Sequence, residues 1–578
     1  MPSNRVMLPR ILFVFVRKEK KDKKKNSLGV IVLKKSVFAL VSSVALLGAA
    51  LAGCAGGQET STPSNNTGQT PAAQPEKKEP QVLRLNLHTE PPTADPGLAE
   101  DSTSGAIVRA TFDGLTRTTE DGKPHESMAE KIEVSSDMLT YTFKLRDAKW
   151  SNGDPVTAHD FEFAWKRVLD PKTAANYAYQ LYYIKNAEKA NKGEAKLDDV
   201  GVKALDDKTL QVTLENPTPY FLELTAFYTY YPVNKKVVEA DPKWATEAKT
   251  HVGNGPFKME TWEHKSKLVL VKNDNYWDKD AVKLDRIEFS MVEDENTELS
   301  MYENGELDWA GAPLSDIPTD ARATLKSAGK LITQPIAGTY WYKFNTEKAP
   351  FNNVKIRKAF TYAINRQAII DNITQTNQQP AMGAVPPSMA LKQDGYFKDN
   401  DVETAKKLLE EGMKELGITK LPPITLSYNT SEGHKKIAEA IQDQWKKSLG
   451  VEVKLENKEW KVYLEDLHQG KFQIGRMGWL GDFNDPINFL ELYKDKNGGN
   501  NDTRWENPKY KELLNKSALE ADPEKRKAIL AEAEAILMEE MPIAPIYFYT
   551  QSYVKNDNIK GVILDGLGFV DWKWAYIE

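Results

Sequence analysis

Residues 424–482 alternate between short strand-like and helix-like segments, and this pattern restricts the fold more than any other stretch of the 578-residue chain. Three segments have the apolar and polar alternation or the aromatic content of strands: Ile424–Tyr428, Val451–Leu455 and Phe472–Trp479. Helical spacing predicts helices between them, at residues 434–449 and about 459–468. Connections this short predict parallel strands joined by right-handed crossovers in a doubly wound α/β sheet.

Asp482 follows the last of these strands, because Gly481 and the Asn-Asp-Pro group at 484–486 predict a turn there. In doubly wound sheets, ligands bind in the crevice beyond the carboxyl ends of the strands, and both Asp482 and His434 fall at that edge. A carboxylate buried there without a positive partner would cost several kcal/mol. We therefore expect a ligand ammonium to supply the charge. The alternatives are that Asp482 caps a turn or pairs with Arg476.

Two longer motifs resemble a known family. Residues 475–490 read Gly-Arg-Met-Gly-Trp-Leu-Gly-Asp-Phe-Asn-Asp-Pro-Ile-Asn-Phe-Leu. This stretch closely resembles the peptide-binding lipoproteins and periplasmic proteins of ABC oligopeptide importers. Residues 129–171, which include Leu-Arg-Asp-Ala-Lys-Trp-Ser-Asn-Gly-Asp-Pro, resemble the signature region of the same family. Shorter matches are Gly-Asn-Gly-Pro-Phe at 253–257 and Asn-Tyr-Trp-Asp at 275–278.

The resemblance covers the chain from residue 82 to its end and implies an α/β, two-lobed periplasmic-binding-protein-like (Venus flytrap) fold with an extra inserted domain. The implied segments are lobe I at 82–112, 237–311 and 551–578, the inserted domain at 113–236, and lobe II at 312–550. The end of the chain would return to lobe I, so two segments would cross between the lobes and form a hinge.

The resemblance also implies the binding residues. Asp482 would take the N-terminal ammonium of an extended peptide, and Arg476 would lie near its carboxylate. The peptide backbone would pair by strand addition with Gly478, Trp479 and Leu480 on one side and with residues 100–102, Glu100 to Ser102, on the other. Three further side chains are assigned to the peptide site: Tyr177, His434 and Tyr549. An ordinary core position is the alternative for Tyr177, and a surface position at a helix start is the alternative for His434. Some relatives have Arg where Leu467 stands, so the preferred peptide length stays open.

Residues 1–53 predict a bacterial lipoprotein signal peptide. Residues 1–35 hold eleven Lys or Arg against two acidic residues, and residues 36–53 carry no charge and end in Leu-Ala-Gly before Cys54, the only cysteine. We expect lipidation of Cys54, for which the resemblance implies at least two acyl chains and stable anchoring. A membrane-spanning anchor is the alternative, and synthesis starting near Leu33 is another possibility. Residues 54–81 are rich in Gly, Ser, Thr, Pro, Gln and Asn, which predicts a flexible tether.

Composition and motifs exclude several functions. Without residues 1–53 the chain has 66 Lys plus Arg against 81 Asp plus Glu, a net charge of −15, which disfavours nucleic acid and anionic membrane surfaces. The sequence contains no Gly-x-Ser-x-Gly, no His-Glu-x-x-His and no Gly-x-x-x-x-Gly-Lys-Ser/Thr, and its seven His are scattered singly. We therefore expect neither an enzyme nor a bound cofactor or metal.

These features together predict a monomeric protein, lipid-anchored at the outer face of the cell membrane, that binds oligopeptides and passes them to ABC permease subunits with their ATPases. The same fold with another cargo is the nearest alternative, namely a dipeptide, a nickel chelate, haem or an oligosaccharide. A receptor for peptide signals and an extracellular peptidase are the others. Neighbouring permease and ATPase genes would favour import, and degradation of a test peptide would favour the peptidase.

Overall fold

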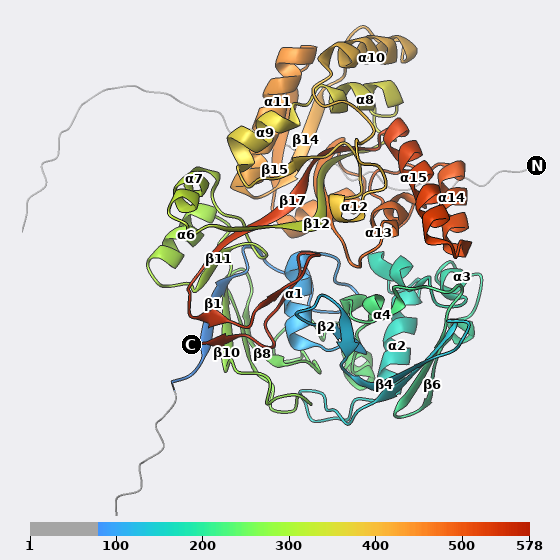
Figure 1. Cartoon of the computed structure of the whole chain (residues 1–578), viewed down its shortest axis with the longest axis vertical. Coiled ribbons are helices and arrows are strands. Elements are labelled where there is room, and N and C mark those ends of the chain that lie inside the picture. The colour runs from blue at the N-terminus through green and yellow to red at the C-terminus, as the bar shows by residue number, and fades with distance from the viewer. Residues whose placement is uncertain (1–78) are drawn as a thin grey trace, which may run out of the picture. The chain divides into compact units, whose positions relative to one another are not determined.

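The computed structural model describes residues 79–578 (Figure 1). The predictions for the signal peptide, for Cys54 and for the tether up to residue 78 lie outside the described residues. The described residues belong to one unit by their contacts, and this unit contains three main sheets. No helix in the described part of the chain is both long enough and apolar enough to cross a membrane.

The first sheet combines segments from distant parts of the sequence. Its order is β1-β10-β9-β8, with β1 parallel to β10 and the other neighbours antiparallel. The bounds are β1 (Val82–Asn86), β8 (Phe257–Glu263), β9 (Lys267–Lys272) and β10 (Arg286–Ser290). Helix α1 (Ser102–Thr111) begins after Asp101, whose side chain accepts hydrogen bonds from the backbone N–H groups of Thr103 and Ser104. This cap places the start of the helix directly after Glu100.

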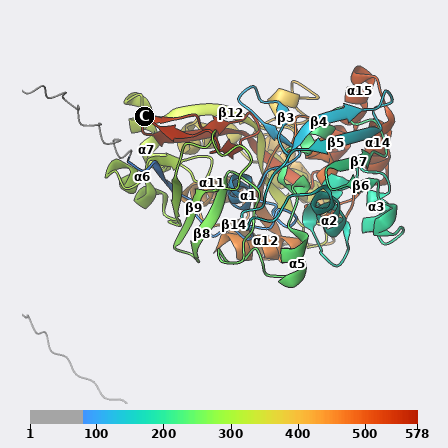
Figure 2. The same cartoon turned by 90° about the horizontal axis from the view of Figure 1, so that it is seen from below.

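The second sheet is antiparallel, with the order β4-β5-β7-β6. Its strands are β4 (Ala129–Val134), β5 (Thr140–Leu145), β6 (Val202–Asp206) and β7 (Thr209–Thr213). Tyr141, Phe143 and Leu145 alternate along β5 and are buried, as the period of two requires. Helix α2 (Ala158–Leu169) packs on β6 and β7 (Figure 2) and opens with a capping box of Thr157 and Asp160.

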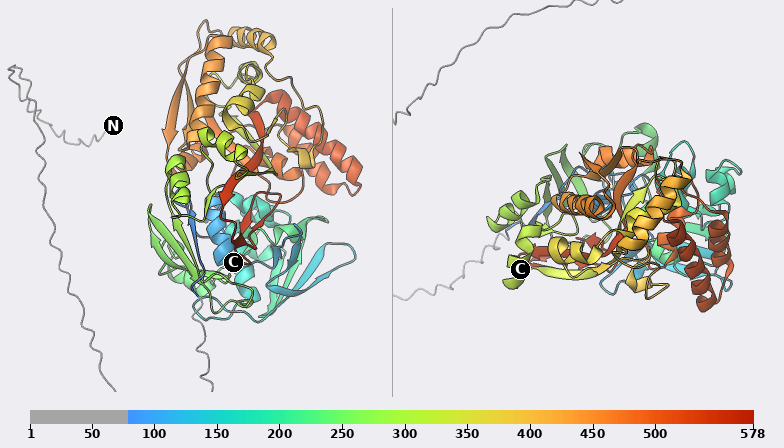
Figure 3. Two further views of the ribbon diagram at one scale, coloured as in Figure 1. Left: turned by 60° about the vertical axis from the view of Figure 1, so that its left-hand side comes forward. Right: turned by 90° about the horizontal axis from the view of Figure 1, so that it is seen from above.

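The third sheet is mixed and contains the predicted parallel unit. Its order is β11-β17-β12-β16-β14-β15. The bounds are β11 (Trp309–Gly311), β12 (Ile332–Phe344), β14 (Ile424–Asn429), β15 (Val453–Lys458), β16 (Ile474–Leu480) and β17 (Ile543–Lys555). Strand β14 pairs in parallel with both β15 and β16, which confirms the parallel arrangement expected from the sequence. Figure 3 shows these strands and their connecting helices in orange.

Helices flank this third sheet. They are α8 (Val354–Tyr362), α10 (Val402–Glu415), α11 (Glu432–Leu449), α12 (Trp460–His468), α14 (Pro508–Leu519) and α15 (Pro523–Glu540). Helices α11 and α12 are the two helices predicted between the parallel strands. Trp445 of α11 is fully buried in the same apolar cluster as Ile424 and Ile474, so burial of the helix face against the sheet holds this unit together.

The end of the chain lies against its described beginning. Strand β18 (Ile559–Lys560) pairs with β21 (Tyr576–Ile577), and the side-chain amide of Gln81 both donates to and accepts from the backbone of Ile577, at 3.0 and 3.1 Å. Strand β17 pairs with β12 and with the short β11. The chain therefore runs through the third sheet before its last residues come back to Gln81. The division into lobe I, inserted domain and lobe II stays a prediction.

Candidate binding site

The carboxyl-terminal half of β16 has one edge without a strand partner among the described residues. On one side, residues 474–480 pair with β12 throughout. On the other side, β14 pairs only with Ile474 and Gly475, so Gly478, Trp479 and Leu480 have no strand beside them there. Such an edge presents backbone N–H and C=O groups in the spacing that an added extended strand requires.

Asp482 lies two residues beyond the end of β16 and is 6% exposed. Its carboxylate accepts from the amide of Gln180 at 2.7 Å, from the hydroxyl of Tyr177 at 3.2 Å and from the amide of Asn488 at 3.2 Å. All three donors are neutral, and no cationic side chain of residues 79–578 forms an ion pair with Asp482. Burial therefore raises the pKa of Asp482 to about 7.

The two alternatives for Asp482, a turn cap and an ion pair with Arg476, do not match its contacts. The turn after β16 is held by Asn488, whose side-chain oxygen accepts from the backbone N–H of Asp482 at 2.9 Å. Arg476 instead donates to the hydroxyl of Tyr549 at 2.8 Å and to the side-chain oxygen of Asn429 at 3.3 Å. The carboxylate of Asp482 thus remains a buried negative charge that a bound cation would stabilise.

Arg476 is the complementary case, a buried cation near the middle of β16. It is 9% exposed, its guanidinium lies 4.6 Å from the centre of the Tyr340 ring, and its Nε has no hydrogen-bond partner. No carboxylate within the described chain forms an ion pair with it. His434 lies 3.4 Å from the Tyr340 hydroxyl, and burial together with the charge of Arg476 lowers the pKa of His434, which keeps this imidazole neutral.

Tyr177 belongs to a two-turn 3₁₀ helix, η1 (Asn176–Leu181), that reaches the end of β16 from a different part of the chain. Its ring centre lies 5.8 Å from that of Trp479, and its side chain is buried. Gln180 follows one turn later and also contacts Asp482. Tyr177 is buried, as expected for an ordinary core residue. Its hydroxyl, however, donates to the carboxylate of Asp482.

Glu100 and Ser102 lie at the start of α1, where Ser102 is exposed and Glu100 is half-buried. The Glu100 side chain is engaged by His468 of α12, whose Nε2 is 3.0 Å from Oε1, and by the amide of Asn176 at 3.1 Å. The other ring nitrogen of His468 lies 2.8 Å from Asp502. Burial lowers the pKa of His468, but its hydrogen bonds to Asp502 and Glu100 outweigh this and raise it to about 10. A protonated His468 therefore links α1 to α12.

Sequence reasoning missed Gln180, Asn488 and His468. The position of Gln180 could have been predicted from its spacing. It lies three residues after Tyr177, and residues three apart fall on the same side of a 3₁₀ helix. The contacts of His468 join residues 368 and 34 positions apart, and no local pattern indicates them.

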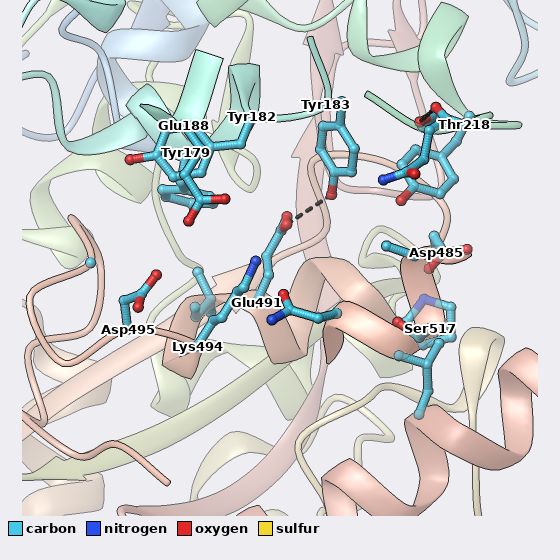
Figure 4. Close-up of a pocket in the computed structure, with 18 of the residues that line it drawn as sticks. Tyr179, Tyr182, Tyr183, Glu188, Thr218, Asp485, Glu491, Lys494, Asp495 and Ser517 are labelled. Carbon is cyan, nitrogen blue, oxygen red and sulfur yellow. Dashed lines mark hydrogen bonds between the residues drawn. The ribbon is translucent and has the colours of Figure 1, made fainter. Parts of the chain in front are cut away.

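A cavity of about 1530 Å³ lies next to this site (Figure 4). One wall is formed by residues 174–192 and 215–220 and the other by residues 484–500 and parts of α14 and α15. Tyr179, Tyr182 and Tyr183 lie on one side of it and Glu491 on the other. Among the described residues, no group of three or more His, Cys, Asp or Glu side chains is arranged to hold a metal ion.

The described fold, with a free strand edge and two buried charges on or just after β16, is that of a two-lobed α/β solute-binding protein. The family model described as bacterial extracellular solute-binding proteins, family 5 Middle, matches residues 123–501. The chain belongs to this family. It is 58% identical over 520 residues to the oligopeptide-binding protein OppA of Bacillus subtilis (strain 168), and the match covers 89% of this chain and 95% of that one.

Solved structures show the same fold. Haemophilus influenzae OppA in complex with the peptide RPPGFSPFR has a TM-score of 0.82 and 33% identity, covering 86% of this chain and 99% of that one. The unliganded open form of the murein tripeptide-binding protein MppA has a TM-score of 0.58 and 34% identity, covering 86% of this chain and 98% of that one. The described chain is thus more similar to the peptide complex than to the open form, in keeping with the direct contacts of Tyr177, Gln180 and Glu100 across the site.

Proposed function

We propose that this protein binds extended oligopeptides outside the cell and delivers them to an ABC permease for uptake. The observation that carries this proposal is the presence of two buried, opposite and unpaired charges, Asp482 and Arg476, along one strand whose edge is free among the described residues. A peptide has an ammonium at one end and a carboxylate at the other. It therefore supplies the missing partner for each charge.

The spacing of the two charges suits a short extended chain. Arg476 and Asp482 are six positions apart, and a strand rises about 3.3 Å per residue, so their backbones are at most about 20 Å apart. The backbone of the bound peptide would pair with Gly478, Trp479 and Leu480. Because main-chain hydrogen bonds are independent of side-chain identity, this mode of binding accepts many sequences.

The remaining predicted residues have supporting positions in this proposal. Tyr177 would pack on the first peptide residue while it holds Asp482, and Tyr549 and His434 would surround the carboxylate end with Arg476. Glu100 and Ser102 would contribute the backbone of the second wall. Relatives named as oligopeptide-binding proteins support an oligopeptide as the ligand.

The cellular setting is also proposed. The family is one of extracellular solute-binding proteins, and we assign the chain a binding role with no catalytic one. We further propose a monomer that is attached to the membrane through lipid on Cys54 and that meets permease subunits and their ATPases there. Hinge closure of the two lobes around the peptide would make the delivered form recognisable to the permease.

Native mass spectrometry of residues 82–578, purified from an expression host, tests the proposed function. A ladder of co-purified masses that match short peptides is the expected result. A single non-peptide mass would overturn the peptide assignment in favour of another cargo. If no mass co-purifies, calorimetry with a defined peptide library decides, and binding of none of its members would overturn the proposal.

Peptide affinity is expected to be highest between about pH 7 and pH 8. The pKa of Asp482 is raised to about 7, so below this pH the carboxyl must lose a proton before it pairs with an ammonium, and affinity falls as the pH falls. A peptide amino terminus has a pKa of about 7.7–8.0, so affinity falls again at higher pH. Calorimetry of a tripeptide with free termini and uncharged side chains across this range checks both limbs. Affinity that does not change on the acid side would contradict the role of Asp482.

A further inference from the structure

Glu491 is a second carboxylate close to the site, and the peptide-binding arrangement above does not use it. It begins the turn η6 (Glu491–Tyr493) and projects into the cavity of Figure 4. Its Oε2 accepts a hydrogen bond from the hydroxyl of Tyr183 at 2.8 Å. Its Oε1 is buried and has no hydrogen-bond partner. A buried carboxylate oxygen without a donor is costly, which indicates that a ligand group satisfies it.

The charged neighbours of Glu491 are either already paired or not in contact with it. Asp485 forms an ion pair with Arg526 at 2.7 Å, and Asp495 pairs with Lys511 and Lys192. Lys494 attracts the Glu491 charge without forming an ion pair within the described chain. Burial, with repulsion from Asp482 and Asp485, outweighs this attraction and raises the pKa of Glu491 to about 8.

One segment connects Glu491 to Asp482. Gln180 contacts Asp482 and Tyr183 contacts Glu491. Gln180 and Tyr183 are three residues apart where η1 ends. A second link is Asn488, which also contacts Asp482 and lies three residues before Glu491. A ligand ammonium at Asp482 would therefore place a nearby side chain within reach of Glu491.

We propose that this cavity receives the side chain of the first peptide residue and that Glu491 selects basic side chains, those of Lys and Arg, at that position. The inference rests on the proposed function. The cavity is far larger than any side chain, so it excludes none by size, and the selection arises from charge. Because the cavity also holds room for water, which weakens electrostatic interactions, the preference is moderate rather than absolute.

Calorimetry with two matched tripeptides tests the proposal. Lys-Ala-Ala is compared with norleucine-Ala-Ala, whose first side chain has similar length and no charge. The wild type is expected to bind the Lys peptide about tenfold more tightly, a free-energy difference of about 1.4 kcal/mol. In Glu491→Gln, which keeps an acceptor for the Tyr183 hydroxyl, the ratio of the affinities for the Lys and norleucine peptides should fall to near one. In the control Glu188→Gln, a more exposed carboxylate of the same cavity that pairs with Lys192, the ratio should persist.

Equal affinity of the wild type for both peptides would overturn the inference, as would an unchanged ratio in Glu491→Gln. A second measurement needs no variant. Binding of the Lys peptide should release more protons than binding of the norleucine peptide, because Glu491 must ionise to pair with it, and calorimetry in buffers of different ionisation enthalpy counts these protons. Equal proton release would also overturn the inference. If neither tripeptide binds, the proposed function itself fails, which is a different result from equal binding.

Discussion

Asp482→Ala is expected to weaken the binding of a peptide such as trialanine by roughly 3–5 kcal/mol, because the peptide ammonium would be buried without its partner. Calorimetry at neutral pH measures this directly. Asp485→Ala is a suitable control, because Asp485 lies three residues further on but already pairs with Arg526 at 2.7 Å. The affinity of this variant for trialanine should change less than tenfold. A change of less than tenfold for Asp482→Ala would contradict the assignment of Asp482.

The carboxylate of Asp482 should also make the peptide-free protein less stable at neutral pH than a variant with a neutral side chain at this position. Because burial raises the folded-state pKa of Asp482 to about 7, the folded protein holds a proton there between about pH 4 and pH 7 that the unfolded chain releases. The proton held by Asp482 stabilises the folded state at low pH, and this stabilisation is lost as the pH rises through 7. Asp482→Asn should therefore raise the melting temperature at neutral pH while it weakens binding, a trade of stability for function.

Arg117→Met is expected to lower the free energy of unfolding by roughly 3–5 kcal/mol, because it leaves buried carboxylates without a cation. Arg117 is 4% exposed and donates to both oxygens of Asp571, at 2.6 and 2.9 Å, and to Asp113 at 3.2 Å. It thus ties the C-terminal segment to residues 454 positions earlier. Urea denaturation of residues 82–578 followed by fluorescence measures the loss.

Arg84→Met is the matched control for this prediction. Arg84 also forms an ion pair, with Asp308 at 2.7 Å, but the Arg84 side chain is 41% exposed whereas that of Asp308 is 8% exposed. Because water reaches this pair from the Arg84 side, its loss should cost less than the loss of Arg117. If Arg117→Met were no more destabilising than Arg84→Met, the buried ion pair would not be what holds the end of the chain in place.

Much of the architecture around the site was predictable from local patterns. The alternation at 424–428 and the helical spacing at 434–449 identified β14 and α11, and the short connections identified their parallel pairing. The position of Asp482 beyond β16 followed from Gly481 and the turn residues. In contrast, the apolar residues at 107–115 suit a helix that starts at Ile107, whereas α1 spans Ser102–Thr111 and begins five residues earlier. The reason is that its first turn depends on the Asp101 cap rather than on apolar spacing.

The sequence by itself determined which segments become strands and helices, where Asp482 and Arg476 fall along one strand, and the family of the chain, because periodicity, turn residues and ordered motifs are local properties. Only the tertiary structure decided that these two charges are buried without partners, that Glu491 opens into a neighbouring cavity, and that His468 links Glu100 to Asp502. Burial and pairing are set largely by residues tens to hundreds of positions away. Whether a charged side chain is satisfied or available to a ligand therefore depends on the packed fold and cannot be read from its neighbours in sequence.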